Sequence, residues 1–194
     1  MQQTPDPAVK PDASLAALRA GRGSPVTLVR FASPQNNGSP GGDPKDRSMS
    51  MNLFLRAFST EDLAAMKQDH ALVDDWISDE QRCIVASDIG AAWDVLNKLL
   101  SGTGFRSNEF LDDVLFNGCE LIEADTVKQH SAQLSGWSHE RLLKELRGRN
   151  PADEAYHLEL FRDEEQDLVI EFDKLLAFYE EAAAKNLAVL HYAA

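Results

Sequence analysis

Apolar and polar residues alternate in the segment that follows Met49, and this alternation predicts a β-strand. In residues 50–58 (SMNLFLRAF) every second residue from Met51 to Ala57 is apolar, and the aromatic content suits a strand. A second apolar run at residues 187–192 (LAVLHY) predicts a closing strand. We expect these two strands to pair in one small sheet.

Helical spacing dominates the sequence between the two strands. The clearest pattern follows Asp88, which we expect to cap a helix that Gly102 ends. Its apolar stripe consists of Ile89, Trp93, Leu96, Leu99 and Leu100. A longer pattern predicts a helix over residues 163–185, which Asn186 ends in the left-handed conformation.

Shorter helices are predicted from capping residues and local spacing. Ser59 or Thr60 begins one of them, and we expect Leu63, Ala64 and Met66 on its inward face. Three others are predicted over residues 71–78, 126–134 and 139–148.

Two segments between the helices admit two interpretations each. Residues 83–87 (CIVAS) are either extended or the lead-in to a helix, and residues 119–124 (CELIEA) form a short strand or a turn. With either outcome the predicted class is α+β. We expect a mostly helical single domain with a small sheet formed by the N- and C-terminal strands, preceded by a disordered tail.

The composition of the chain changes at Met49. Residues 1–48 hold seven of the eight prolines, with six basic and four acidic side chains and a net charge of +2. Residues 49–194 hold the remaining 13 basic and 28 acidic side chains and have a net charge of −15. The first segment cannot bury enough apolar surface to offset the entropy lost on ordering, so we predict a disordered tail before one folded domain. A linker and misread upstream sequence are the alternatives. The pair Lys45-Asp46 can be encoded as AAG-GAY, which contains the ribosome-binding run AAGGA, so we expect the native start at Met49 or Met51.

The acidic excess of the predicted domain restricts its partners. A net charge of −15 repels nucleic-acid phosphates, and the domain lacks the basic face that anionic lipid surfaces attract. Basic proteins or cationic small molecules suit this charge, and solubility alone is the simpler explanation of it. Cys83 and Cys119 lie in apolar contexts without CxxC spacing, which predicts reduced thiols and a cytoplasmic protein. No apolar run approaches the ~18 residues that a membrane span needs.

Neither the histidines nor the carboxylates follow a known catalytic or metal-binding spacing. No two histidines lie four residues apart, so we expect surface or end-of-element positions for all of them. They are His70, His130, His139, His157 and His191. Five carboxylates are of the right type for acid–base chemistry or a divalent cation, but their spacing matches no EF-hand loop. They are Asp112, Asp113, Glu120, Glu123 and Asp125. We predict no metal and no cofactor.

Three stretches of the chain share motifs with a known family. Residues 49–59 begin with a Met-Xaa-Met strand that starts at Met49 and Met51, residues 87–104 contain a Ser-Asp-Ile…Ala-Trp helix ending in Leu-Leu-Ser-Gly, and residues 175–192 form a closing helix and strand rich in Phe-Tyr and Ala. In these motifs the sequence resembles the YfbM-like family of small bacterial proteins, which is catalogued as a domain of unknown function. The resemblance spans residues 49–194. It implies the fold of that family and no particular reaction.

The sequence departs from the family pattern in two places. Ala91 stands where the family usually has Lys before Ala-Trp. The family's Gly-Gly-Glu motif is retained only as Asn117, Gly118 and Glu120, and its following Gly-Pro-Xaa-Tyr-Leu segment is absent. If that loop carries an activity shared by the family, this chain lacks it.

Three classes of function are consistent with these observations. We predict a non-catalytic module that binds a basic protein through charge complementarity, such as an immunity protein that neutralises a basic toxin or effector. The predicted contact residues are Asp112, Asp113, Glu120, Glu123 and Trp137, the last as a tryptophan anchor for which burial is the simpler outcome. An enzyme or small-molecule binder using the 103–125 loop is the alternative, and a pocket holding Glu120 and a histidine would favour it. A self-associating structural protein is the third class.

Overall fold

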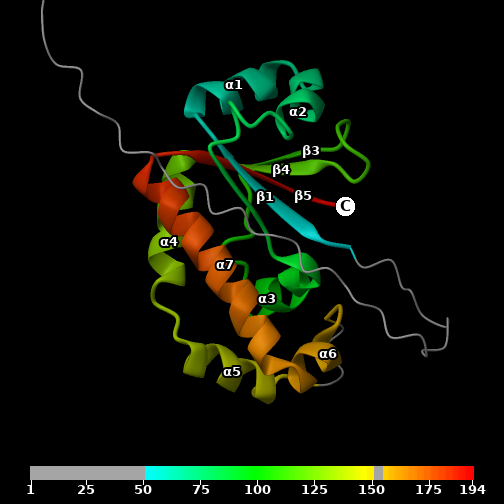
Figure 1. The fold of residues 1–194 in the computed structure, drawn as a ribbon, viewed down its shortest axis with the longest axis vertical. Helices are drawn as coiled ribbons and strands as arrows, with labels where there is room; N and C mark the ends of the chain where they lie inside the picture. Colours follow the sequence, from blue (N-terminus) through cyan, green and yellow to red (C-terminus); the bar gives the residue numbers. More distant parts are fainter. Residues whose placement is uncertain (1–50, 151–154) are drawn as a thin grey trace, which may run out of the picture. The chain divides into compact units, whose positions relative to one another are not determined.

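The structure, a computed structural model, describes residues 51–150 and 155–194. The predicted tail over residues 1–48 lies outside these residues, so the tail and the chain start stay predictions. The described residues form a five-stranded antiparallel sheet with helices on both faces (Figure 1). The α+β class is therefore confirmed.

The sheet brings the two ends of the described chain together. Its strands lie in the order β2-β1-β5-β4-β3, and every neighbouring pair is antiparallel. Their bounds are β1 Leu53–Phe58, β2 Val85–Asp88, β3 Glu109–Leu111, β4 Cys119–Ile122 and β5 Ala188–Ala193. The predicted pairing of the first and last strands is confirmed, since β1 lies directly beside β5. Both segments that were left open, in β2 and β4, are extended.

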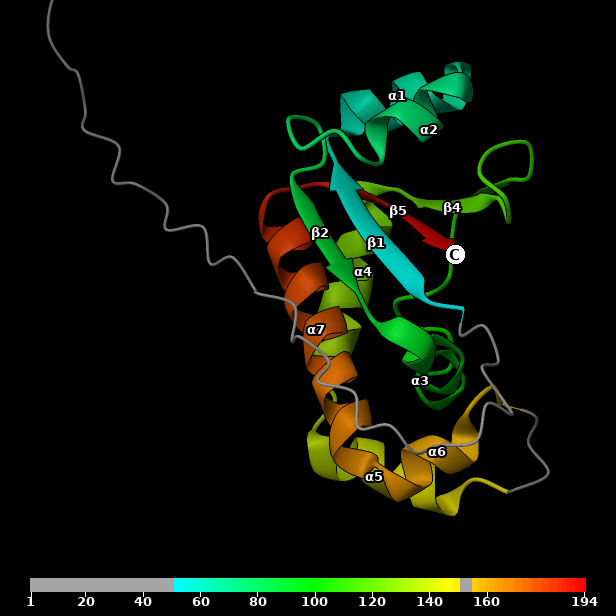
Figure 2. The same cartoon turned by 45° about the vertical axis from the view of Figure 1, so that its right-hand side comes forward.

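The helices cover the two faces of the sheet unequally. Their bounds are α1 Thr60–Gln68, α2 Ala71–Trp76, α3 Trp93–Leu99, α4 Ala124–Leu134, α5 His139–Gly148, α6 Leu158–Asp163 and α7 Glu165–Ala184. Figures 1 and 2 place α1 and α2 on one face, and α3, α4 and α7 on the other. Because β5 is covered on both faces, its residues Ala188 to His191 are all buried. Three of these four residues are apolar, and the fourth is the histidine.

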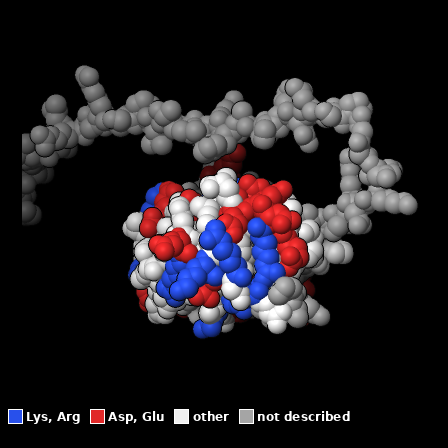
Figure 3. All heavy atoms as spheres, turned by 90° about the horizontal axis from the view of Figure 1, so that it is seen from below, with Lys and Arg blue, Asp and Glu red and all other residues white. Residues whose placement is uncertain are grey.

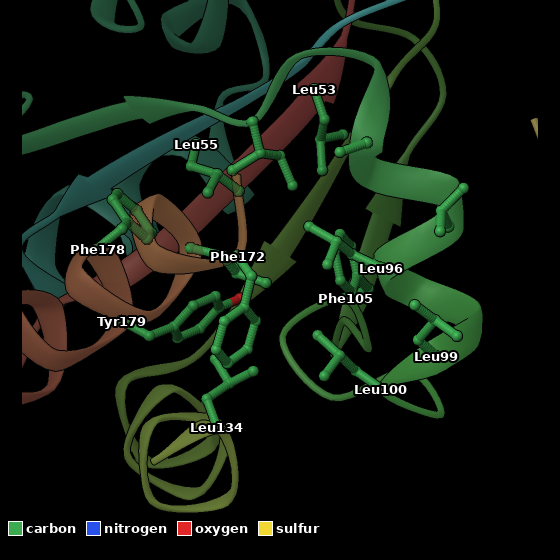
Figure 4. Close-up of a cluster of buried hydrophobic side chains, with 14 of the residues drawn as sticks. Leu53, Leu55, Leu96, Leu99, Leu100, Phe105, Leu134, Phe172, Phe178 and Tyr179 are labelled. Atoms are coloured by element: carbon green, nitrogen blue, oxygen red, sulfur yellow. The ribbon is translucent and has the colours of Figure 1, made fainter. Parts of the chain in front are cut away.

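The larger core lies between the sheet and the helices α3, α4 and α7. In Figure 4, Leu55 from β1, Leu96 from α3, Leu134 from α4 and Phe172 from α7 point toward one another. A smaller core on the other face includes Met66 from α1. Burial of apolar area of this kind is the main favourable term in folding, at about 25 cal/mol per Å².

Several predicted helix ends are confirmed in atomic detail. The hydroxyls of Ser59 and Ser138 accept hydrogen bonds from main-chain N–H groups one turn later, at 3.0 and 3.2 Å. Gly102 and Asn186 have left-handed φ angles of 82° and 54° after α3 and α7.

The prediction of a helix capped by Asp88 is wrong in its start. Asp88 ends β2, and its side chain accepts a hydrogen bond from the N–H of Gly90 at 2.8 Å. Gly90 has a left-handed φ of 51°, which a regular helix cannot include, so a short 3₁₀ turn precedes α3. Trp93 is only partly buried, and its indole N–H donates to the main-chain oxygen of Met51 at 3.1 Å.

Two further predictions are corrected. The expected helix over residues 163–185 begins later, at Glu165, because Glu164 has non-helical angles that separate α6 from α7. Ala64 faces solvent, since Leu63 and Met66, three residues apart, are sufficient to seat α1 on the sheet.

Candidate functional site

A pocket of about 290 Å³ lies at the end of the sheet where β5 ends and β1 begins. Its walls come from the ends of these strands, from α3 and the segment after it, and from the β3–β4 hairpin. The lining residues are Met51, Leu53, Trp93, Asn97, Phe105, Phe110, Asn117, Gly118, Cys119, Glu120, His191, Tyr192 and Ala193. We call it the His191 pocket.

Strand register places three of these side chains in one row across the sheet. Phe110 on β3 is paired with Glu120 on β4, and Glu120 is paired with His191 on β5. Directly paired residues project to the same face, so the three side chains are neighbours although they are far apart in sequence. The Nε2 atom of His191 lies 3.5 Å from a carboxylate oxygen of Glu120.

His191 is buried, and its Nε2 atom forms no hydrogen bond with any described residue. The residue is 4% exposed, and Nε2 has no hydrogen-bond partner among the described residues, because the contact with Glu120 is too long and poorly aligned. Burial lowers the pKa of His191, and the negative charge of Glu120 only partly opposes this effect. The imidazole is therefore neutral near pH 7, and His191 is one of the residues that line the pocket.

A second buried histidine and a tyrosine lie behind His191. The Nδ1 atom of His130 on α4 also has no hydrogen-bond partner among the described residues, and its ring contacts Tyr179 edge-on at 5.6 Å. Burial lowers the pKa of His130, and the nearby His191 adds to this shift. Buried polar atoms in native proteins usually have partners, so two unpartnered nitrogens close together mark this region as unusual.

Aromatic residues form much of the remaining wall. Trp93 opens α3 and is held by its hydrogen bond to Met51, while Phe105 is almost fully buried and anchored in the larger core. Phe110, at 56% exposure, lies at the mouth. Asn117 closes the hairpin side by donating from its amide to the main-chain oxygen of Ala193 at 3.0 Å.

Gly118 sets the position of Phe110. It has a left-handed φ of 74°, and a Cβ atom there would lie 2.6 Å from a ring carbon of Phe110 and 2.5 Å from the main-chain oxygen of Leu111. No side chain fits at this distance, so the phenyl ring packs directly on the glycine backbone. The Asn-Gly pair recognised in the sequence thus shapes the pocket mouth.

A second hollow, of about 320 Å³, lies between α1 and α4 and contains Glu123 and Asp125. Its charged groups are already paired: Lys67 contacts Glu123 at 2.9 Å and Glu109 at 3.1 Å. Among the described residues that line this hollow, none has a buried side-chain nitrogen or oxygen without a hydrogen-bond partner, so we regard the His191 pocket as the candidate site.

The predicted contact residues on the β3–β4 loop are exposed. Asp112 and Asp113 both face solvent, and Asp113 contacts Nδ1 of His70 at 2.7 Å. This hydrogen bond raises the pKa of His70 and lowers that of Asp113. Only Glu120 among the five predicted residues lines the candidate pocket.

Trp137 lies elsewhere and is covered. It is half-buried just before α5, and the guanidinium of Arg141 stacks over its ring at 3.8 Å. Helix α5 lies at the opposite end of the domain from the β3–β4 hairpin (Figure 1). Figure 3 shows Lys and Arg side chains in the middle and lower part of this end, with Asp and Glu above them and at the sides. The five predicted residues therefore do not form one surface.

The prediction of surface or end-of-element positions for all histidines is wrong for His130, which is buried within α4, and for the buried His191. A signal was present in the sequence. His191 has the same strand parity as the inward-facing Val189, and His130 follows Val127 by three residues on the apolar stripe of α4. The partner that makes His191 notable, Glu120, is known only once the strand register is known.

Two other features bear on the site. Across residues 51–150 and 155–194, no group of three His, Cys, Asp or Glu side chains is arranged to hold a metal ion. No helix in the same ranges combines the length and apolarity needed to cross a membrane.

Comparisons with known proteins agree on the fold. The family model for a domain of unknown function, DUF1877, matches residues 49–192. The crystal structure of YfbM from Escherichia coli, a protein of unknown function, is similar with a TM-score of 0.52 and 15% identity, over 74% of this chain and 99% of that one. No curated protein matches the sequence.

Proposed function

This chain belongs to the DUF1877 family, and since that membership supplies a fold and no reaction, we propose a function from the geometry: it binds a small organic molecule in the His191 pocket. This is the alternative that the sequence left open. We expect the protein to bind this ligand in the cytoplasm.

One observation carries the proposal. The neutral ring of His191 is 4% exposed, its Nε2 has no partner among the residues that the structure describes, and it lines a pocket of about 290 Å³ in which a carboxylate oxygen lies 3.5 Å away. An unpartnered buried polar atom costs about 1–3 kcal/mol, a cost that a ligand making the missing hydrogen bond offsets. Aromatic walls around a few polar groups are the usual composition of small-molecule sites.

We limit the proposal to binding because the pocket offers no activated nucleophile. Cys119 is the one thiol among the lining residues, and burial raises its thiol pKa to about 12. The thiol therefore stays protonated near pH 7 and is a poor nucleophile.

A fragment screen by ligand-observed NMR against the full-length chain tests the proposal. We expect hits whose binding is lost in Phe110→Ala and retained in Ile170→Ala, an exposed apolar residue on α7 that serves as the matched control. Phe110 is itself largely exposed, so its truncation leaves the core intact, which circular dichroism checks. Absence of hits, or equal loss in both variants, would contradict the proposal.

A second candidate is the protein-binding module predicted from the sequence, with an immunity protein as one form. One observation favours it: Phe116, in the loop that carries Asp112 and Asp113, is 99% exposed. An exposed aromatic side chain beside acidic groups is typical of an anchor for a basic partner.

Affinity capture from native lysate at low and high salt tests this second candidate. It requires a basic protein that is retained at low salt, released at high salt and lost with Phe116→Ser but not with Ile170→Ser. Retention by both variants would contradict an interface at the β3–β4 loop. The two candidates are separable, since the Phe110 and Phe116 variants report on different surfaces.

A further inference from the structure

We infer that the ligand of the His191 pocket is a compact organic cation with an ammonium head that carries N–H groups. This inference deepens the proposed function and rests on it. It follows from the charge of the lining, from the aromatic walls and from the unpartnered nitrogen of His191.

The lining carries one negative charge and no permanently positive side chain. Glu120 is the only acidic residue among the thirteen that line the pocket, and none of them is Lys or Arg. An anionic ligand would bring a second negative charge next to this carboxylate in a partly desolvated site, which like-charge repulsion disfavours. A cation is attracted by Glu120 and by the acidic excess of the whole protein.

The aromatic side chains suit the same charge. Phe110 lies beside Glu120 in the cross-strand row, and Trp93 and Phe105 come from the opposite wall. The faces of aromatic rings carry negative potential and attract ammonium groups, which is the basis of ammonium recognition by aromatic residues. The pocket therefore combines a counter-charge with apolar walls for the body of the ligand.

His191 adds a directional requirement. The Nε2 atom of His191 has no hydrogen-bond partner in the described part of the chain, and in the tautomer protonated on Nδ1, which a donor ligand would select, it carries a lone pair. Two N–H groups of one ammonium can then donate, one to Nε2 and one to the Glu120 carboxylate, because the two acceptor atoms lie 3.5 Å apart. A quaternary ammonium, without N–H groups, leaves this nitrogen unsatisfied.

The test uses three probes of one shape that differ in their head group. Full-length protein is titrated calorimetrically with 2-phenylethylammonium, 2-phenylethanol and 3-phenylpropanoate. We expect the ammonium to bind at least about tenfold more tightly than the other two, from the cation–π and charge contributions. Glu120→Gln should bring the ammonium close to the alcohol, and the matched charge change Glu123→Gln, outside the pocket, should leave the preference unchanged.

The outcomes separate this inference from the proposed function. Binding of the alcohol or the propanoate as tight as that of the ammonium, and sensitive to Phe110→Ala, overturns the cation and keeps the pocket as a site. Equal effects of Glu120→Gln and Glu123→Gln overturn the role of Glu120. Absence of binding by all three probes overturns the cation inference, and the fragment screen then decides the proposed function independently.

Discussion

The phenol of Tyr179 donates a 2.6 Å hydrogen bond to the main-chain oxygen of Gly104. Tyr179 is fully buried on α7, and Gly104 immediately precedes Phe105, which lines the His191 pocket. Burial and the charge of Glu120 raise the pKa of Tyr179, so its hydroxyl keeps the proton that it donates. This bond therefore fixes the pocket wall to the central helix of the core.

We expect Tyr179→Phe to reduce the free energy of unfolding by about 1–3 kcal/mol, because the buried Gly104 oxygen loses its partner. Urea denaturation followed by circular dichroism measures this loss. Tyr192→Phe is the control, since the Tyr192 hydroxyl makes no hydrogen bond with any described residue. Equal losses in the two variants would show that the bond contributes nothing specific.

The buried histidines predict that stability declines toward acidic pH. Burial lowers the pKa of His191, which faces Glu120 and His130, and the pKa of His130, which is also near Arg106. The unfolded chain then binds more protons than the folded one. Stability is full above the unfolded pKa of about 6.5 and is lost as pH falls through it. Urea midpoints at pH 7.5 and 5.5 should differ accordingly.

Two variants separate the contributions to this pH dependence. His191→Gln should flatten the decline, because one group that resists protonation in the folded state is removed. His70→Asn should steepen it, because Asp113 raises the pKa of His70 and this histidine contributes stability that is present below its unfolded pKa. A decline unchanged by His191→Gln would refute the assignment to buried imidazoles.

The fold class was predictable because the signals that determine it are local. Each signal depends on residues that are close together in the sequence. Examples are the alternation in β1, the helix caps at Ser59 and Ser138, and the left-handed residue Asn186 that ends α7. The two errors in helix boundaries arose where such signals were weak. Gly90 and Glu164 interrupt helical patterns through backbone angles that their residue types do not require.

The site was only partly predictable because strand register creates it. Glu120 was recognised as a candidate from residue type, but His191 becomes its neighbour only through the pairing of β4 with β5. Acidic and aromatic residue type alone selected Asp112, Glu123 and Trp137 as candidate contacts. The sequence does not show that some of these side chains already have partners in the fold. Lys67 contacts Glu123, and Arg141 stacks over the indole of Trp137.

The two cysteines should differ in reactivity. Cys119 is buried, and desolvation raises its thiol pKa to about 12, so its thiolate fraction at pH 8 is on the order of 10⁻⁴. Cys83 is partly exposed, although burial also raises its pKa. We expect iodoacetamide to label Cys83 first in the folded protein and Cys119 only after unfolding, as measured by mass spectrometry of tryptic peptides. Labelling of Cys119 first, without denaturant, would contradict its burial.

Gly118 and Gly148 form a matched pair for testing how the pocket mouth is built. Alanine at Gly118 must adopt a left-handed φ, at a cost of about 1–2 kcal/mol, and its Cβ meets the main-chain oxygen of Leu111 and the ring of Phe110. Alanine at Gly148 in α5 meets nothing within 4 Å and should stabilise by up to about 1 kcal/mol. Urea unfolding measures both effects.

Ligand binding adds a readout that stability does not supply. Gly118→Ala has to displace the Phe110 ring, so fragments that bind the His191 pocket should bind this variant more weakly under conditions where both variants are fully folded. Gly148→Ala should bind them as the unmodified chain does. If the two variants bind fragments equally well, Phe110 is not held by the glycine contact and the mouth of the pocket is formed in another way.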